Sequence, residues 1–356
     1  CDELPAEHRL AFLLAVSNGR KDFAQTRLLY AQSHISPTSA WGVASLRLAL
    51  QADLELGKHV EAAERFAEVN AATGTDARVQ AENALLWARH FPNKKSREAL
   101  LQAATQADQG GVFLECALAL PDLFSGTDDA SAAITCLERL LESKTVSTAI
   151  EARLALAAIA LDSTSQTKIM HARQALAAAR EESVRRQALT VLGELLCQQP
   201  ETTNEGLQVL RDAVRLNPSA TEAPALQLKI AETLEQLARH DEALQAYDQY
   251  LESYDEPAFR VRIRQGRARA LLATKRGNEA LASLLEAIEL EEETKKRETL
   301  LMEAADVAIT AGQPARAVAL YRRLLKTHRS SNVLLHLARA LEAENKIDEA
   351  MHIYES

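Results

Sequence analysis

Aromatic residues are scarce in this chain of 356 residues, where Phe, Trp and Tyr together make up only 4%. Glycine and proline are also rare, with 12 and 9 copies. Folds rich in β-sheet use aromatic residues in their strands and glycine and proline in their many turns. Hydrophobic residues nevertheless reach 47%, with alanine and leucine, both strong helix formers, common among them. The composition therefore predicts a helical protein with a substantial buried core.

Cysteine is rare as well. The four copies, Cys1, Cys116, Cys136 and Cys197, are too few and too scattered for a disulfide framework. Cys116 and Cys136 lie in apolar helical stretches, where we expect reduced core thiols. No apolar run approaches the roughly 20 residues that a membrane-spanning helix needs, and the chain contains no signal peptide. We therefore expect no membrane insertion within this chain.

Positive charge is not in excess, because 41 Lys and Arg face 50 Asp and Glu, which gives a net charge of −9. Sequence-independent binding of nucleic acid needs a basic face, so the balance disfavours a nucleic-acid partner. The chain also lacks a glycine-rich phosphate loop, a G-x-S-x-G motif and an H-E-x-x-H motif. Its nine histidines occur singly, without the spacing of metal ligands. We predict no enzyme, and no catalytic, metal or cofactor site.

One short pattern recurs along the chain: a polar turn, a small residue, and an aromatic residue or leucine four positions later. Clear copies are Ala243 with Tyr247 and Ala317 with Tyr321. The small residues, here called anchors, are Ala24, Ala62, Ala99, Ala133, Ala172, Gly206, Ala243, Ala280, Ala317 and Ala350. They follow one another at intervals of 33 to 39 residues. Such a period indicates a repeat architecture.

Each period contains two apolar helical stripes separated by a short polar turn. In the segment 225–253, Leu226, Ile230 and Leu234 form the first stripe, and Ala243 and Tyr247 belong to the second. Two antiparallel helices approach closely only where side chains are short, which explains a small anchor. A single hairpin buries too little surface to be stable, so neighbouring hairpins must stack.

This pattern resembles the tetratricopeptide repeat (TPR) family. The family's large-small-large, small and aromatic positions are matched by Leu337-Ala338, Leu341, Ala350 and Tyr354, and again by Ile230-Ala231, Leu234, Ala243 and Tyr247. The resemblance covers nearly the whole chain and is strongest from about residue 185 onward. It implies an all-α, right-handed α-solenoid of about ten TPR-like helical hairpins. Most periods exceed the family's 34 residues, so several helices or loops should be longer.

We expect N-terminal repeats over residues 1–108 and C-terminal repeats over residues 131–356. Between them, residues 109–130 are irregular and predict an atypical repeat or a bend, with an ordinary repeat with longer loops as the alternative. The chain stops within an amphipathic helix, which suggests an array truncated at its end. It starts at Cys1, which fits either a lipidated lipoprotein terminus or a cut in a longer chain. The location is then cytoplasmic, or periplasmic and membrane-attached if Cys1 carries lipid.

The resemblance also implies which residues bind a partner, because first helices line the concave inner face of TPR arrays. The family's inward positions, counted back from each anchor, select Arg262, Arg269, Glu303, Asp306, His336 and Arg339. Trp87 lies near that set and is either a contact residue or a packing residue. The three arginines should face Glu303 and Asp306, and arginine binds carboxylates in bidentate fashion. Alternatively, these charges pair with one another across adjacent helices.

We therefore predict a non-enzymatic scaffold whose concave groove binds a protein or peptide segment with acidic and apolar side chains. None of the ten inward positions 11 residues before an anchor is Asn, so a carboxylate-clamp co-chaperone is excluded. One alternative is a periplasmic or membrane-anchored scaffold of an envelope or polysaccharide-export assembly. Another is a helical-repeat RNA binder, which the net charge disfavours.

Overall fold

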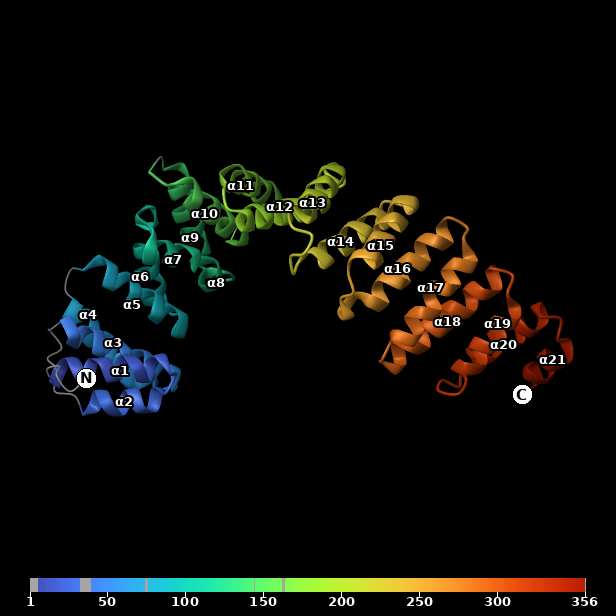
Figure 1. The fold of residues 1–356 in the computed structure, drawn as a ribbon, viewed down its shortest axis with the longest axis horizontal. Helices are drawn as coiled ribbons and strands as arrows, with labels where there is room; N and C mark the ends of the chain where they lie inside the picture. Colours follow the sequence, from blue (N-terminus) through green and yellow to red (C-terminus); the bar gives the residue numbers. More distant parts are fainter. Residues whose placement is uncertain (1–5, 33–39, 74–75, 144, 162–163, 356) are drawn as a thin grey trace. The chain divides into compact units, whose positions relative to one another are not determined.

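The structure is a computed structural model that describes residues 6–32, 40–73, 76–143, 145–161 and 164–355. Within these residues it contains 21 α-helices and no strand (Figure 1). The helices follow one another as ten hairpins, one of which has its first helix divided in two. The predicted all-α fold of repeated hairpins, an α-solenoid, is confirmed. Cys1, for which lipidation and a cut in a longer chain were the two alternatives, lies outside the described residues.

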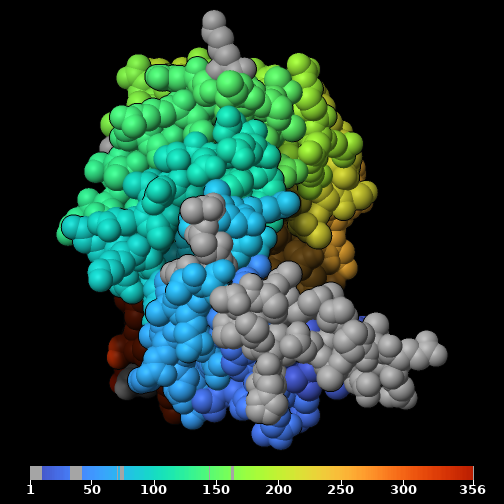
Figure 2. Space-filling view, turned by 90° about the vertical axis from the view of Figure 1, so that its left-hand side faces the viewer, coloured from blue at the N-terminus to red at the C-terminus, as the bar shows by residue number. Residues whose placement is uncertain are grey.

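The chain divides into two compact units, residues 1–188 and residues 189–356, here called the first and second units. The first unit contains α1 (Ala6–Gly19), α2 (Phe23–Ala31), α3 (Ala40–Glu55), α4 (His59–Thr73), α5 (Ala77–His90), α6 (Lys94–Ala104), α7 (Gly111–Leu118), α8 (Leu120–Phe124), α9 (Ala130–Glu142), α10 (Thr148–Leu161) and α11 (Ser165–Ala178). Its hairpins follow one another in chain order, from the blue of α1–α4 through the teal of α7–α9 to the green of α10 and α11 (Figure 2).

The boundary between the units falls within α12 (Glu182–Cys197). The second unit continues with α13 (Thr203–Leu216), α14 (Ala223–Gln236), α15 (His240–Ser253), α16 (Arg260–Ala273), α17 (Gly277–Leu290), α18 (Thr294–Thr310), α19 (Pro314–Leu324), α20 (Ser331–Ala343) and α21 (Ile347–Glu355). Short 3₁₀ turns, η1 (Ala107–Gln109) and η2 (Pro257–Phe259), precede α7 and α16.

The small anchors lie where the helices of a hairpin meet. Ala243, Ala280, Ala317 and Ala350 are each the fourth residue of a second helix, and none exposes any surface. Burial of the aromatic residue one turn later depends on the hairpin that follows. The side chain of Tyr247 is fully buried, whereas Tyr354, in the last helix described, is 45% exposed. A small anchor thus permits the two helices of a hairpin to approach closely, and the aromatic residue packs that hairpin against the next one.

Two of the ten predicted anchors are wrong. Ala24 is exposed and Ala99 is only partly buried. The fourth residue of α2 is instead the buried Thr26, whose hydroxyl lies 3.0 Å from Ser17 Oγ. In the first turn of α6 the small buried residue is Ser96, whose hydroxyl oxygen lies 2.6 Å from the Phe91 carbonyl oxygen and 2.8 Å from that of Asn93. Hydroxyl side chains that bond locally replace alanine at these two contacts, so a search for alanine selected neighbouring positions.

The irregular segment contains a divided first helix. Gly110 and Gly111 have φ angles of 71° and 56°, and α7 begins at the second of these glycines. The helix is interrupted again at Ala119. The next helix, α8, carries Pro121 in its first turn and is only five residues long. Gly126, with a φ of 73°, opens the loop that leads to α9. The hairpin is therefore built from three helices rather than two.

The turn inside most hairpins has a left-handed residue five positions before the anchor. These residues are Gly57, Ala238, Lys275, Gly312 and Asn345, with φ between 56° and 71°. Lys21, with a φ of 59°, stands five positions before Thr26, which supports Thr26 as the contact residue of the first hairpin. Only glycine adopts this conformation without a steric cost.

Ala238→Gly should therefore stabilise the second unit. The side chain of Ala238 is exposed and its φ is 56°, so glycine relieves steric strain without removing packing, and we expect a gain of about 0.5–1 kcal/mol in the free energy of unfolding. Urea unfolding followed by far-UV circular dichroism measures it. Gly312→Ala, at the equivalent turn, is the control and should lose about as much. Equal shifts of the same sign in both variants would contradict this account.

Candidate partner-binding face

Charged side chains of the second unit gather where the first helices of successive hairpins lie side by side. We call this surface the first-helix face. It comprises Glu232 and Glu235 of α14, Arg262, Gln265 and Arg269 of α16, Glu303 and Asp306 of α18, and His336 and Arg339 of α20. Direct contacts link α14 to α16, α16 to α18 and α18 to α20 along this surface.

Arg262 makes a bidentate ion pair with Glu232 of the preceding first helix. Its Nε lies 2.5 Å from Glu232 Oε1 and its Nη2 lies 2.8 Å from Oε2. The arginine side chain remains 60% exposed, whereas the glutamate is mostly covered. The pair therefore fixes the guanidinium in place and still presents it to solvent.

Arg269 repeats this arrangement two helical turns further along α16. Its Nε and Nη2 donate to the two carboxylate oxygens of Glu235 at 2.5 and 3.1 Å, and its side chain is 42% exposed. The Tyr247 hydroxyl donates to the same carboxylate at 2.7 Å. Burial by itself would raise the pKa of Glu235, but the hydrogen bonds from Arg269 and Tyr247 outweigh it and hold that pKa below its ordinary value. Burial, followed by the bond to Glu235, raises the pKa of Tyr247.

Glu235→Gln should remove a part of the stability that depends on pH. Because the folded pKa of Glu235 lies below 4.5, its contribution is complete above that pH and is lost as the pH falls through the folded pKa. We expect the variant to be less stable than the wild type by about 1 kcal/mol near pH 7 and by clearly less near pH 3. Urea unfolding at both pH values measures the difference. The control Glu279→Gln removes an exposed pair with Arg276 and should change little at either pH. A deficit near pH 3 as large as that near pH 7 would refute the ionic origin.

The remaining first helices carry a second cluster. The Tyr321 hydroxyl donates to Asp306, and burial, followed by this bond, raises the pKa of Tyr321. His336 Nδ1 lies 3.4 Å from Asp306 Oδ1 and 3.4 Å from the Tyr321 oxygen. Glu303 accepts a hydrogen bond of 2.9 Å from Gln265. Arg339 is exposed and forms no ion pair with any residue that the structure describes.

The structure corrects the partners expected for the arginines. Arg262 and Arg269 pair with Glu232 and Glu235 rather than with Glu303 or Asp306. The alternative, in which the charges pair across adjacent helices, describes both of them. Sequence reasoning missed Glu235 and Tyr247, although Glu235 follows the inward position Glu232 by three residues and so lies on the same helix face.

Trp87 lies in the first unit and takes part in packing. Its ring stacks on Phe66 of α4, with 4.3 Å between centroids, and contacts Phe91 at 4.5 Å. All three rings pack against the apolar cluster around Leu46 and Leu50 of α3. The packing alternative therefore accounts for this tryptophan. Cys116 and Cys136 are buried, as expected of core thiols.

Other kinds of site lack support in the part of the chain that the structure describes. No group of three or more His, Cys, Asp or Glu side chains there could hold a metal ion. No helix among the described residues combines the length and apolar character needed to cross a bilayer.

Two segments match family models of the tetratricopeptide repeat, residues 225–256 and residues 302–356. No curated protein matches the chain. Among solved structures, MamA is 19% identical, with 49% of this chain and 96% of that one covered and a TM-score of 0.40. A putative kinesin light chain repeat protein of Podosopora anserina is 21% identical, with 50% and 94% covered and a TM-score of 0.38. PilF of Pseudomonas aeruginosa is 17% identical, with 57% and 86% covered and a TM-score of 0.37.

Proposed function

Because this chain is a protein of the tetratricopeptide repeat family, whose members generally act as non-catalytic interaction scaffolds, we propose that its first-helix face binds a segment of a protein partner. The segment carries acidic and apolar side chains, and the role is non-enzymatic. One observation carries the proposal. Arg262 and Arg269 stand seven residues apart on α16, both are held by a carboxylate, and their side chains are still 60% and 42% exposed.

Each of these guanidiniums has donors to spare. In both arginines the pair to glutamate uses Nε and Nη2, and no described residue accepts a hydrogen bond from Nη1. A guanidinium has five N–H donors in a rigid fork, so the free edge can bind a carboxylate of the partner. Because the glutamates already fix both side chains, binding costs less side-chain entropy than it would for mobile arginines.

The experiment compares two double variants of the same helix. Arg262→Gln with Arg269→Gln removes the two arginines of the first-helix face. Arg264→Gln with Arg267→Gln removes two others on α16, whose ion-pair partners Glu286 and Asp248 belong to second helices. Both variants lose two positive charges and two ion pairs. The wild-type chain and both variants are immobilised, and proteins retained from native extract are identified and titrated.

We expect the first variant to lose the partner, with at least about tenfold weaker binding, and the second to keep it. Circular dichroism should show the same helical content in all three proteins. Equal retention of a partner by both variants would show that Arg262 and Arg269 do not contribute to its binding. Retention that disappears after nuclease treatment would instead favour an RNA-mediated contact.

A further inference from the structure

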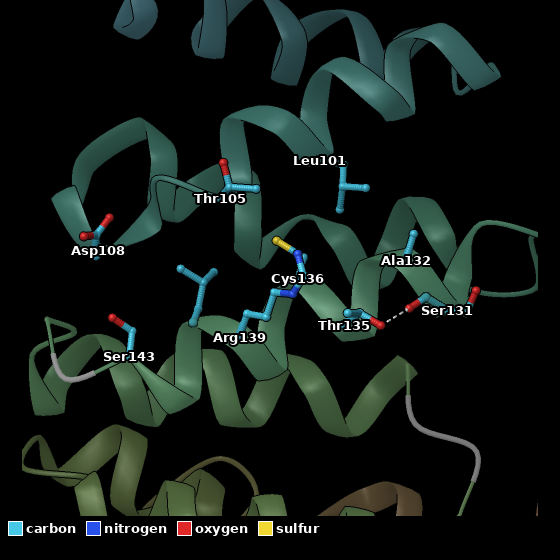
Figure 3. A pocket seen from close by; sticks show the side chains of 10 residues that line it. Leu101, Thr105, Asp108, Ser131, Ala132, Thr135, Cys136, Arg139 and Ser143 are labelled. Atoms are coloured by element: carbon cyan, nitrogen blue, oxygen red, sulfur yellow. Dashed lines mark hydrogen bonds between the residues drawn. The ribbon is translucent and has the colours of Figure 1, made fainter.

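A groove of about 640 Å³ separates α6 from α9 on the surface of the first unit (Figure 3). Leu101 and Thr105 line one wall, together with Asp108 of η1. Thr135, Arg139 and Leu140 of α9 belong to the other. These are second helices, and they lie in the other unit from the first-helix face. The volume falls within the range of about 300–1,000 Å³ that is usual for binding clefts.

Two of the four hydroxyl groups that line the groove, those of Thr105 and Thr135, have only acceptor capacity left for an occupant. Thr105 Oγ1 donates to the Gln102 carbonyl at 2.7 Å, and Thr135 Oγ1 donates to the Ser131 carbonyl at 2.8 Å. A hydroxyl has one hydrogen, so once it is donated within its own helix only the lone pairs remain for an occupant. The groove therefore offers acceptors for N–H donors, which a polypeptide backbone supplies at every residue except proline.

The two charges of the groove are both unpaired among the described residues. Arg139 forms no ion pair there, and Asp108 accepts only a hydrogen bond of 3.2 Å from the Thr145 hydroxyl. The bond from Thr145, which follows α9, places Asp108 toward the carboxyl end of that helix. Opposite charges that line one groove without neutralising each other complement an occupant that carries both an acid and a base. A purely anionic or purely cationic molecule would satisfy only one of them.

The length of the groove indicates how much chain it holds. The face of α9 that lines it runs from residue 131 to residue 143. At 1.5 Å per residue this is about 18 Å, or about five residues of extended chain. We propose that the groove binds an extended segment of a protein partner, about five residues long, with apolar side chains against Leu101 and Leu140, an acidic side chain at Arg139 and a basic side chain at Asp108.

The test uses fluorescent peptides with blocked termini and measures fluorescence polarisation with the full chain. Leu-Leu-Glu-Ala-Lys and its reverse, Lys-Ala-Glu-Leu-Leu, cover the two directions in which a chain can lie. In the matched pair, Leu-Leu-Lys-Ala-Glu and Glu-Ala-Lys-Leu-Leu, the charges are exchanged and the composition is unchanged. We expect one of the first two peptides to bind at least about fivefold more tightly than its charge-exchanged partner.

Arg139→Glu should weaken the preferred peptide by at least about fivefold, and Arg139→Glu with Asp108→Lys should reverse the preference. Arg185→Glu is the control, because this exposed arginine of the first unit lies outside the groove and undergoes the same change of charge. Both groove positions are exposed, so the helical content should not change. The control should bind as the wild type does.

Three results would overturn the proposal. The first is no binding of any of the four peptides at millimolar concentration. The second is equal binding of peptide and charge-exchanged partner in both chain directions, and the third is equal effects of Arg139→Glu and Arg185→Glu. Displacement of a bound peptide by decanoate alone, without charge preference among the peptides, would assign the groove to a small amphiphile instead. Arg262 and Arg269 are unaltered throughout, so failure here leaves the proposed function of the first-helix face intact.

Discussion

Replacing Asp53 by alanine is expected to lower the free energy of unfolding of the first unit by about 3 kcal/mol. Asp53 lies in α3 and exposes no surface. Arg27 Nε donates to its Oδ1 at 2.6 Å, and Arg65 Nε donates to its Oδ2. The carboxylate thus joins α2, α3 and α4. Two guanidiniums, each less than half exposed, depend on this one buried anion.

The cost is large because the two arginines have unequal alternatives. Without Asp53, Arg27 retains its pair with Glu61 at 2.9 Å, whereas Arg65 keeps its contacts with the uncharged Tyr30, whose ring centroid lies 4.6 Å away. Removing one member of a buried ion pair strands the other charge in a poorly hydrated place, which is why such truncations commonly cost about 3–5 kcal/mol. Partial exposure of the arginines puts the estimate at the lower end of that range.

Tryptophan fluorescence measures this loss selectively, because Trp41 and Trp87 are the only tryptophans and both belong to the first unit. The urea midpoint seen by fluorescence should fall in Asp53→Ala. The matched control is Glu61→Ala, which removes an exposed acid from the same Arg27 and should cost less than about 1 kcal/mol. Equal shifts in the two variants would contradict the buried-anion account.

The repeats were predictable from the sequence because close helix packing constrains the anchor at a fixed interval. Ala243, Ala280, Ala317 and Ala350 are all fully buried at the fourth position of a second helix. The regularity weakens where another small residue serves the same contact. Thr26 and Ser96 meet the steric need with side chains that also bond to nearby oxygens, and a search for alanine does not distinguish them from exposed polar residues.

Long-range charge pairing was not predictable in the same way. In the sequence, Asp53 resembles any polar position of an amphipathic helix. Its ion-pair partners, Arg27 and Arg65, lie 26 residues before it and 12 residues after it. On α16, helical spacing selects Arg262 and Arg269 for the first-helix face, but their carboxylate partners stand 30 and 34 residues earlier. Which acid meets which base depends on the offset between neighbouring hairpins, and a period that varies from 33 to 39 residues leaves that offset open.

Gly266→Ala should destabilise the second unit even though alanine is the better helix former. Gly266 lies in the interior of α16, against the fully buried ring of Tyr247. A Cβ atom at this position would lie 2.8 Å from Tyr247 Cε1 and closer still to Cζ and the hydroxyl. The ring cannot give way freely, because its hydroxyl also donates to Glu235 beneath Arg269. We expect a net loss of about 1–3 kcal/mol, with overpacking outweighing a gain of about 1 kcal/mol in helix propensity.

The cause can be isolated by changing the other side of the contact. In a Tyr247→Leu background the obstructing ring is absent, and leucine is the residue that the next hairpin carries at the equivalent position, Leu284. There Gly266→Ala should become neutral or stabilising by up to about 1 kcal/mol, because only the helix-propensity gain remains. Urea unfolding followed by far-UV circular dichroism gives all four corners of this cycle. A loss of equal size in both backgrounds would show that α16 requires glycine for a reason other than Tyr247. The packing of the Tyr247 ring against Gly266 would then not explain the effect.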